Sequence, residues 1–217
     1  GHDVLIQNNA GANIGFLNDQ YIAAGAKLID SAEDVYKSSE MIVKVKEPIP
    51  DEYKFLRDDL TLFTYLHLAG DPENAKKLID TGVTGIAYET VTSSDGSMPL
   101  LAPMSEVAGR ISIQAGARSL EMTNNGRGVL LSGATGAPPA NVVIIGCGVV
   151  GFNAALIAHG MKANVILIDQ SQQRLDELKS FFNDEVTTVI STPGNIAPCR
   201  EGSLKKFSSS ITPVPKN

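Results

Sequence analysis

Short apolar runs alternate with amphipathic stretches along most of the chain. Runs rich in Val, Ile, Thr and aromatic residues predict strands, and apolar residues spaced three or four apart predict helices. The predicted strands cover residues 4–6, 26–29, 41–46, 60–66, 84–91, 142–145, 164–168 and 185–190. The predicted helices cover residues 18–24, 71–80, 105–122, 152–158 and 172–182, with a further one beginning near residue 31. This alternation predicts a layered α/β fold.

The capping and linker residues between these elements predict two domains. Asn18, Ser31 and Ser105 are candidate N-caps. Residues 99–103, which contain two prolines, form a predicted extended linker ahead of the helix capped by Ser105. We therefore place the first domain at residues 1–104 and the second at residues 105–193. The last 24 residues, 194–217, carry three prolines and a net charge of +3, and we expect a loop or disordered tail there.

Composition narrows the class of protein. The chain is 43% hydrophobic and 19% charged, with a mean hydropathy of +0.02, as in soluble globular proteins. The net charge of −6 argues against a general nucleic-acid binder. No run approaches the ~18 apolar residues of a membrane span. Two cysteines, Cys147 and Cys199, make neither a disulfide framework nor a metal cluster, which favours a reducing, cytoplasmic setting.

The clearest chemical signal is a glycine-rich loop after the strand at 142–145. Gly146 allows a tight turn, Gly148 lets the backbone approach a pyrophosphate, and Gly151 lets the following helix pack closely against the strand. The amino end of that helix offers free N–H groups to phosphate oxygens. The alternative is a plain turn of glycines between packed elements. We favour a dinucleotide site of the Rossmann type, of which only the first half follows in the sequence.

Asp169 supports this interpretation, because it ends the next predicted strand, 18 residues after Gly151. A carboxylate there accepts hydrogen bonds from adenosine ribose hydroxyls and repels a 2′-phosphate, which favours NAD over NADP. Arg174 lies five residues further on and is a feature that could instead accommodate the phosphate. Under the alternative, Asp169 would only cap the helix that follows.

Candidate chemistry in the first domain lies at strand ends. His67 follows the apolar run 62–66, and Lys46 precedes Glu47-Pro48. A histidine can act as an acid or base near neutral pH, and a lysine can bind a carboxylate or polarise a carbonyl. Taken alone, each residue type is more often structural or solvated. Cys147, inside the glycine loop, is expected to pack as a small residue.

Several segments together resemble alanine dehydrogenases. They are KVKEP (44–48), LFTYLHLA (62–69), IAYETV (86–91), LLAPMSEVAGR (100–110), GRGVL (126–130) and the glycine loop. The resemblance extends over residues 1 to about 196. It implies two domains, an α/β substrate domain and an incomplete Rossmann-type NAD-binding domain, which close over a cleft. It also implies NAD-dependent oxidative deamination of L-alanine to pyruvate and ammonium, by an enzyme that assembles as a homohexamer.

The resemblance assigns roles to individual residues. Lys46 matches the lysine that binds the carboxylate and carbonyl side of the substrate, and His67 matches the active-site acid/base. The cofactor-binding set consists of Ser105, Gly146, Gly148, Val149, Val150, Gly151, Asp169, Arg174 and Ser191.

The family also has segments with no counterpart here, including an N-terminal arginine for the substrate carboxylate and a catalytic aspartate. We therefore expect this chain to be an incomplete copy. Three alternatives stay open at this point: a nucleotide-binding subunit of a transhydrogenase with a membrane partner, a non-catalytic remnant that binds adenine nucleotides, and a relative that prefers glycine to alanine.

Overall fold

A computed structural model describes residues 1–192, and the predicted tail at 194–217 lies outside the described residues. The chain forms two compact units, Gly1–Leu101 and a second that begins at Ala102. The second unit thus begins three residues before the predicted division at 104/105. Each unit is described by itself.

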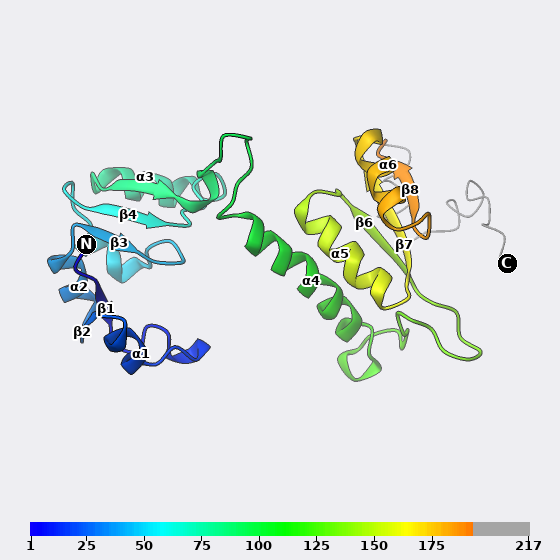
Figure 1. Ribbon diagram of the computed structural model, residues 1–217, viewed down its shortest axis with the longest axis horizontal. Coiled ribbons are helices and arrows are strands. Elements are labelled where there is room, and N and C mark those ends of the chain that lie inside the picture. Colours follow the sequence, from blue (N-terminus) through cyan, green and yellow to red (C-terminus); the bar gives the residue numbers. More distant parts are fainter. Residues whose placement is uncertain (193–217) are drawn as a thin grey trace. The chain divides into compact units, whose positions relative to one another are not determined.

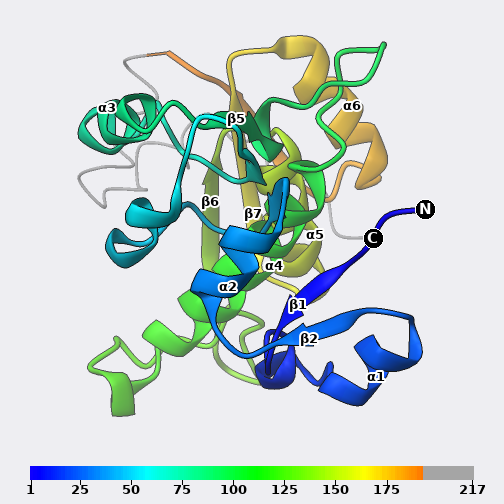
Figure 2. The same cartoon turned by 90° about the vertical axis from the view of Figure 1, so that its left-hand side faces the viewer.

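The first unit contains two parallel sheets. One pairs β1 with β2, and α1 connects these two strands (Figure 2). The other has the strand order β3-β4-β5, and α3 connects β4 with β5 (Figure 1). The elements are β1 (Leu5–Gln7), α1 (Asn18–Ala23), β2 (Lys27–Ile29), α2 (Ala32–Ser38), β3 (Met41–Val43), β4 (Thr61–Thr64), α3 (Pro72–Asp80) and β5 (Thr84–Ala87).

Side-chain caps begin two of its helices. The Ser31 hydroxyl accepts the Asp34 N–H at 3.1 Å, as predicted, and so satisfies one of the free donors of α2. Asp71 does the same for α3 by accepting the Asn74 N–H at 3.0 Å. The prediction that Asn18 caps α1 is wrong, because Asn18 is already the first helical residue. Its side-chain oxygen instead accepts the Asn9 N–H at 2.9 Å.

The core of the first unit is built on alternate residues in and next to strand β4. Leu60, Leu62 and Leu66 are buried and pack with Leu78 of α3. Arg57 binds the end of α2. Its guanidinium donates to the carbonyl oxygens of Tyr36 and Ser39 at 2.6 and 2.7 Å. These bonds satisfy carbonyls at the end of α2 that have no partner within the helix.

The second unit is a parallel sheet with the strand order β6-β7-β8. Helix α5 connects β6 with β7, and α6 connects β7 with β8, which is the predicted first half of a doubly wound domain. Figure 1 shows α4 running alongside α5. The elements are α4 (Ala102–Ser119), β6 (Asn141–Ile145), α5 (Val149–Gly160), β7 (Asn164–Asp169), α6 (Gln172–Phe181) and β8 (Thr187–Ile190).

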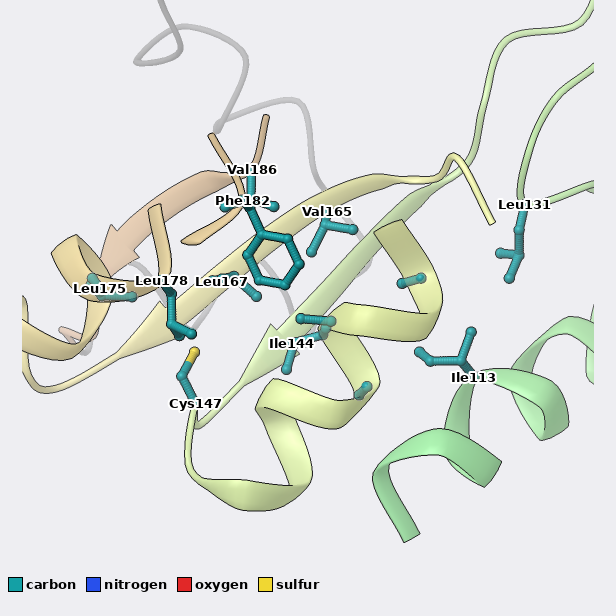
Figure 3. Packing of buried hydrophobic residues seen from close by; sticks show 13 residues of the cluster. Ile113, Leu131, Ile144, Cys147, Val165, Leu167, Leu175, Leu178, Phe182 and Val186 are labelled. Carbon is teal, nitrogen blue, oxygen red and sulfur yellow. The ribbon is translucent and has the colours of Figure 1, made fainter. Parts of the chain in front are cut away.

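Strand β7 is the centre of this unit and is buried on both faces. Val165 and Leu167 point into the main core with Ile144, Leu178 and residues of α4 and α5 (Figure 3). Ile166 and Ile168, which alternate with them, form a smaller cluster on the other face. A parallel strand covered on both faces needs such a continuous apolar run.

Some predicted boundaries move. The prediction that Ser105 caps the long helix is wrong, since α4 begins at Ala102 and places Ser105 within its first turn. Pro103 is compatible with this start because the first-turn N–H groups need no helical partner. The predicted strand at 84–91 ends at Ala87, and a 3₁₀ turn follows over Tyr88–Thr90.

Helices α4 and α5 meet at a glycine that sequence reasoning did not single out. Gly109 is buried, and a Cβ built there would lie 2.2 Å from the carbonyl oxygen of Val150 and 2.9 Å from Cβ of Asn153. Only a residue without a side chain allows the two backbones to approach this closely.

Gly109→Ala should destabilise the second unit by about 1–3 kcal/mol, because the obstructing atom belongs to the backbone and α4 must move away from α5. Gly116→Ala is the matched control in the same helix, since a Cβ there meets nothing within 4 Å. It should be neutral or stabilising by up to about 1 kcal/mol. Urea unfolding followed by circular dichroism measures both changes, and equal stability of the two variants would contradict the close helix contact.

Candidate functional site

The glycine loop occupies the carboxyl end of β6. Gly146 has φ +87°, a conformation that favours glycine, and its N–H donates to the Ile168 carbonyl oxygen at 2.8 Å. Gly148 is the N-cap of α5, with Val149 and Val150 as exposed residues of the first turn. The first N–H groups of α5 therefore face outward without intrahelical partners, as an anion requires.

Two further glycines in this loop behave differently, as the motif predicts. A Cβ on Gly151 would lie 1.9 Å from the carbonyl oxygen of Gly146, so this glycine is needed for helix–strand packing. A Cβ on Gly148 would meet nothing within 4 Å and would project into open space beside the amino end of α5. A bare backbone at that point fits the close approach of a pyrophosphate.

Asp169 connects the ends of β6 and β7. Its carboxylate accepts the Cys147 N–H at 2.6 Å and the Ser171 N–H at 2.9 Å. The bonds from Ser171 and Cys147, with a smaller contribution from Arg174, hold the pKa of Asp169 below its ordinary value. The carboxylate is therefore ionised at neutral pH and keeps acceptor capacity beyond these two bonds. The α6 cap is the Ser171 hydroxyl, which accepts the Arg174 N–H at 3.2 Å.

Arg174 also bonds to the glycine loop. Its Nε donates to the Cys147 carbonyl oxygen at 3.0 Å, and its guanidinium carbon lies 5.6 Å from the centre of the Phe152 ring. A terminal nitrogen also donates to Glu177 at 3.2 Å. Asp169 and Arg174 thus bond to the N–H and the C=O of one residue, Cys147, and we call this arrangement the Cys147 brace.

The other predicted residues of this region have separate positions. The Ser191 N–H donates to the backbone oxygen of Asp169 at 2.7 Å, which places Ser191 beside the end of β7. Ser105 is partly buried in the first turn of α4. Cys147 is fully buried, and burial, with Asp169 nearby, raises the pKa of its thiol to about 11. That thiol stays protonated at neutral pH, in keeping with a packing role.

A groove of about 480 Å³ lies beside the glycine loop, with Gly148, Arg174, Phe152 and Arg110 among its lining residues. Arg110 donates from Nε to the side-chain oxygen of buried Asn153 at 3.0 Å, and Asn153 donates to the Val149 carbonyl oxygen at 3.0 Å. Neither Arg110 nor Asn153 was predicted. Arg110 ends the motif at 100–110, and Asn153 is the one polar side chain in the apolar stretch 149–158 of α5, so each had a signal in the sequence.

The first unit gathers polar residues where β3, β4 and β5 end. The Thr64 hydroxyl donates to the Lys46 carbonyl oxygen at 2.8 Å, so the loop after β3 lies against the end of β4. The Lys46 side chain is exposed. Each of Lys46, His67 and Glu89 comes just after the carboxyl end of one of these strands. Because the strands are parallel, the three residues lie at the same edge of the sheet.

His67 is held at three points. Its φ of +52° is uncommon for a residue with a side chain. The Glu89 carboxylate stabilises this bend by accepting the N–H groups of His67 at 2.7 Å and Leu66 at 3.1 Å. The ring Nδ1 lies 3.1 Å from Oε2 of Glu47. Glu89 and Glu47 were not predicted as site residues, although both lie within the motifs at 86–91 and 44–48.

Glu47 is the carboxylate that faces the imidazole. Its own backbone N–H, followed by His67 and Lys46, holds the pKa of Glu47 below its ordinary value. Nearby, the Tyr65 and Tyr88 rings make an edge-on contact with centres 4.9 Å apart, and the Tyr65 hydroxyl donates to the Leu100 carbonyl oxygen. The edge thus brings together a lysine, an imidazole, carboxylates and two tyrosine rings.

In residues 1–192, no group of three His, Cys, Asp or Glu side chains is placed so that it could hold a metal ion. The helices of this range also lack the length and apolar composition of a membrane span.

Comparisons with known proteins agree with the fold. The chain is 50% identical over 91% of its length to the alanine dehydrogenase of Methanococcus maripaludis, and 51% identical over 91% to that of Bacillus subtilis. A solved L-alanine dehydrogenase superposes with a TM-score of 0.82 at 48% identity, covering 90% of this chain and 54% of that one. A transhydrogenase structure from Sinorhizobium meliloti, at 21% identity and a TM-score of 0.70, shares the fold.

The match covers only part of each relative. The chain spans about half the length of the curated relatives it matches, 53% and 52% for the two above. Residues 1–108 match the model for the N-terminal domain of alanine dehydrogenase/PNT, and residues 112–203 match the model for the C-terminal domain. The chain therefore belongs to the alanine dehydrogenase/PNT family.

Proposed function

We propose that this chain provides substrate-binding and nucleotide-binding elements of an NAD-dependent alanine dehydrogenase. The observation that carries the proposal is the braced glycine loop, with a bare Gly148 at the amino end of α5 and an ionised Asp169 beside it. The relatives at about half identity are named alanine dehydrogenase, which supports L-alanine as the substrate.

In this proposal the second unit binds the nucleotide. The backbone of Gly146, Gly148 and Gly151 leaves space for the pyrophosphate, and the N–H groups of Val149 and Val150 bind its oxygens. Asp169 accepts from the ribose hydroxyls. The remaining contacts to the adenosine side come from Ser105, Arg174 and Ser191. Bound NAD supplies the acceptor for a hydride.

The same geometry favours NAD over NADP. The Asp169 carboxylate would repel a 2′-phosphate placed where the ribose hydroxyls bind. Arg174 is the residue that could neutralise such a phosphate, but its guanidinium is already bonded to Cys147 and Glu177 and packs over Phe152. Moving it would break the Cys147 brace.

The first unit binds the amino acid. Lys46 is proposed to bind the carboxylate and carbonyl side of the substrate, and His67 to act as the acid/base. A hydride leaves Cα of L-alanine together with loss of a proton from nitrogen, which gives an imine. Water adds to the imine carbon, and the resulting carbinolamine releases ammonium and leaves pyruvate. His67 holds and returns the protons of these last steps.

We further propose that the enzyme works as a homohexamer in the cytoplasm. Support for the setting comes from the composition, which contains two cysteines, and from the buried, protonated thiol of Cys147. Sedimentation velocity on the purified protein tests the assembly, and a monomer at micromolar concentration would contradict it.

Because the chain spans about half of its relatives, activity is best tested in a chimera. Residues 1–192 replace the matching segment of the Bacillus subtilis relative, and NADH formation from L-alanine is followed by absorbance. We expect His67→Ala to lower the rate about 100-fold or more, since a general acid/base is removed. His159→Ala, which alters a histidine of the second unit, should retain the rate.

Two outcomes would contradict this proposal. One is a folded chimera whose rate is the same in the His67→Ala and His159→Ala variants. The other is hydride exchange between two nucleotides with no requirement for L-alanine, which is the activity of a transhydrogenase.

Gly148→Ala should weaken NAD binding about tenfold or more, because the added methyl group occupies the space next to the phosphate-binding N–H groups. Gly160→Ala is the matched control at the other end of α5, where a Cβ also meets nothing within 4 Å. Both variants should unfold like the wild type. Calorimetric titration with NAD measures the affinities, and equal affinities would show that the loop does not hold the pyrophosphate.

A further inference from the structure

Two histidines in residues 1–192 form pairs with glutamates, and the pairs use different ring nitrogens. His67 faces Glu47 through Nδ1 at 3.1 Å. His159 faces Glu185 through Nε2 at 2.7 Å. A carboxylate accepts and cannot donate, so each glutamate favours the imidazole form with the proton on the nitrogen it faces.

The backbone of His67 is held by a residue other than Glu47. Glu89, from the turn after β5, accepts the N–H groups of His67 and Leu66 and holds the backbone in its left-handed bend. The ring then retains rotation about its side-chain bonds. A second anchor from the loop after β3 removes that freedom.

Glu47 is suited to be that anchor. It lies between Lys46 and Pro48, which is buried and fixes the local chain direction. Its side chain is 38% exposed and that of His67 is 48% exposed, so the pair lies at the surface of the site rather than in the core. Two other charged groups lie near the pair: Glu89 bonds to the backbone of His67, and Lys46 precedes Glu47 in the chain and acts on its carboxylate.

We propose that Glu47 is a positioning residue that holds His67 with its proton on Nδ1 and so leaves Nε2 as the nitrogen that faces the substrate. The consequence for catalysis rests on the proposed function, in which His67 is the acid/base. The tautomer itself does not, because it follows from the geometry of the first unit alone. An imidazole with a fixed tautomer starts each cycle with its accepting nitrogen already oriented.

The test is a long-range ¹H–¹⁵N spectrum of the ¹⁵N-labelled full chain, recorded above the titration range of histidine. In the wild type, His67 should carry its proton mainly on Nδ1 and His159 mainly on Nε2, so the two residues give opposite patterns in one spectrum. In Glu47→Ala, the Nδ1–H form of His67 should fall from the major to the minor species. Glu47→Gln, whose amide can either accept from Nδ1–H or donate to Nδ1, should leave a smaller share of the Nδ1–H form than the wild type.

Glu185→Ala is the matched control, since it removes the carboxylate from the other pair and should leave the His67 signals unchanged. A wild-type His67 protonated on Nε2, or a His67 pattern unaltered in Glu47→Ala, would overturn the proposal. Because the wild-type spectrum alone can give the first result, the test stands even if a variant does not fold. The expected tautomers, together with a folded chimera that does not act on L-alanine, would leave the tautomer assignment intact and refute the proposed function.

Discussion

The second unit depends on the Cys147 brace, in which Asp169 and Arg174 bond to the N–H and C=O of one loop residue. Strands β6 and β7 are parallel, so their carboxyl ends meet at the same edge and Asp169 can reach across to the glycine loop. An unbonded loop N–H at this partly buried edge would cost free energy. The bond that prevents this cost also fixes the carboxylate proposed to bind the ribose, so folding and nucleotide recognition share one interaction.

The first unit also depends on parallel strands whose carboxyl ends lie at one edge. Three parallel strands bring Lys46, His67 and Glu89 to one edge, although up to 43 positions separate them in the sequence. Glu89 and Glu47 then fix the backbone and the ring of His67. In both units a carboxylate near the end of a neighbouring strand accepts backbone N–H groups of a loop, and at His67 that loop has a positive φ, which is uncommon for a residue with a side chain.

The sequence predicted features that depend on local patterns. The apolar run of β7, the Ser31 cap and the glycine loop each follow from residues adjacent in the chain, and all three are confirmed. The start of α4 was misplaced because Ser105 is a good cap, whereas Pro103 within the first turn was the better signal. Contacts between distant segments could not be predicted: the approach of Gly109 to Val150 and the pairing of Glu47 with His67 depend on how the chain folds in three dimensions. The binding roles of the site residues remain predictions.

The most direct test of this account is calorimetric titration of the purified chain with NAD and, separately, with NADP. With Asp169 ionised and Arg174 engaged in the brace, NAD should bind about tenfold or more tightly than NADP. Equal affinities, or tighter binding of NADP, would contradict the account, because they would require a brace that opens and an arginine that turns to the 2′-phosphate.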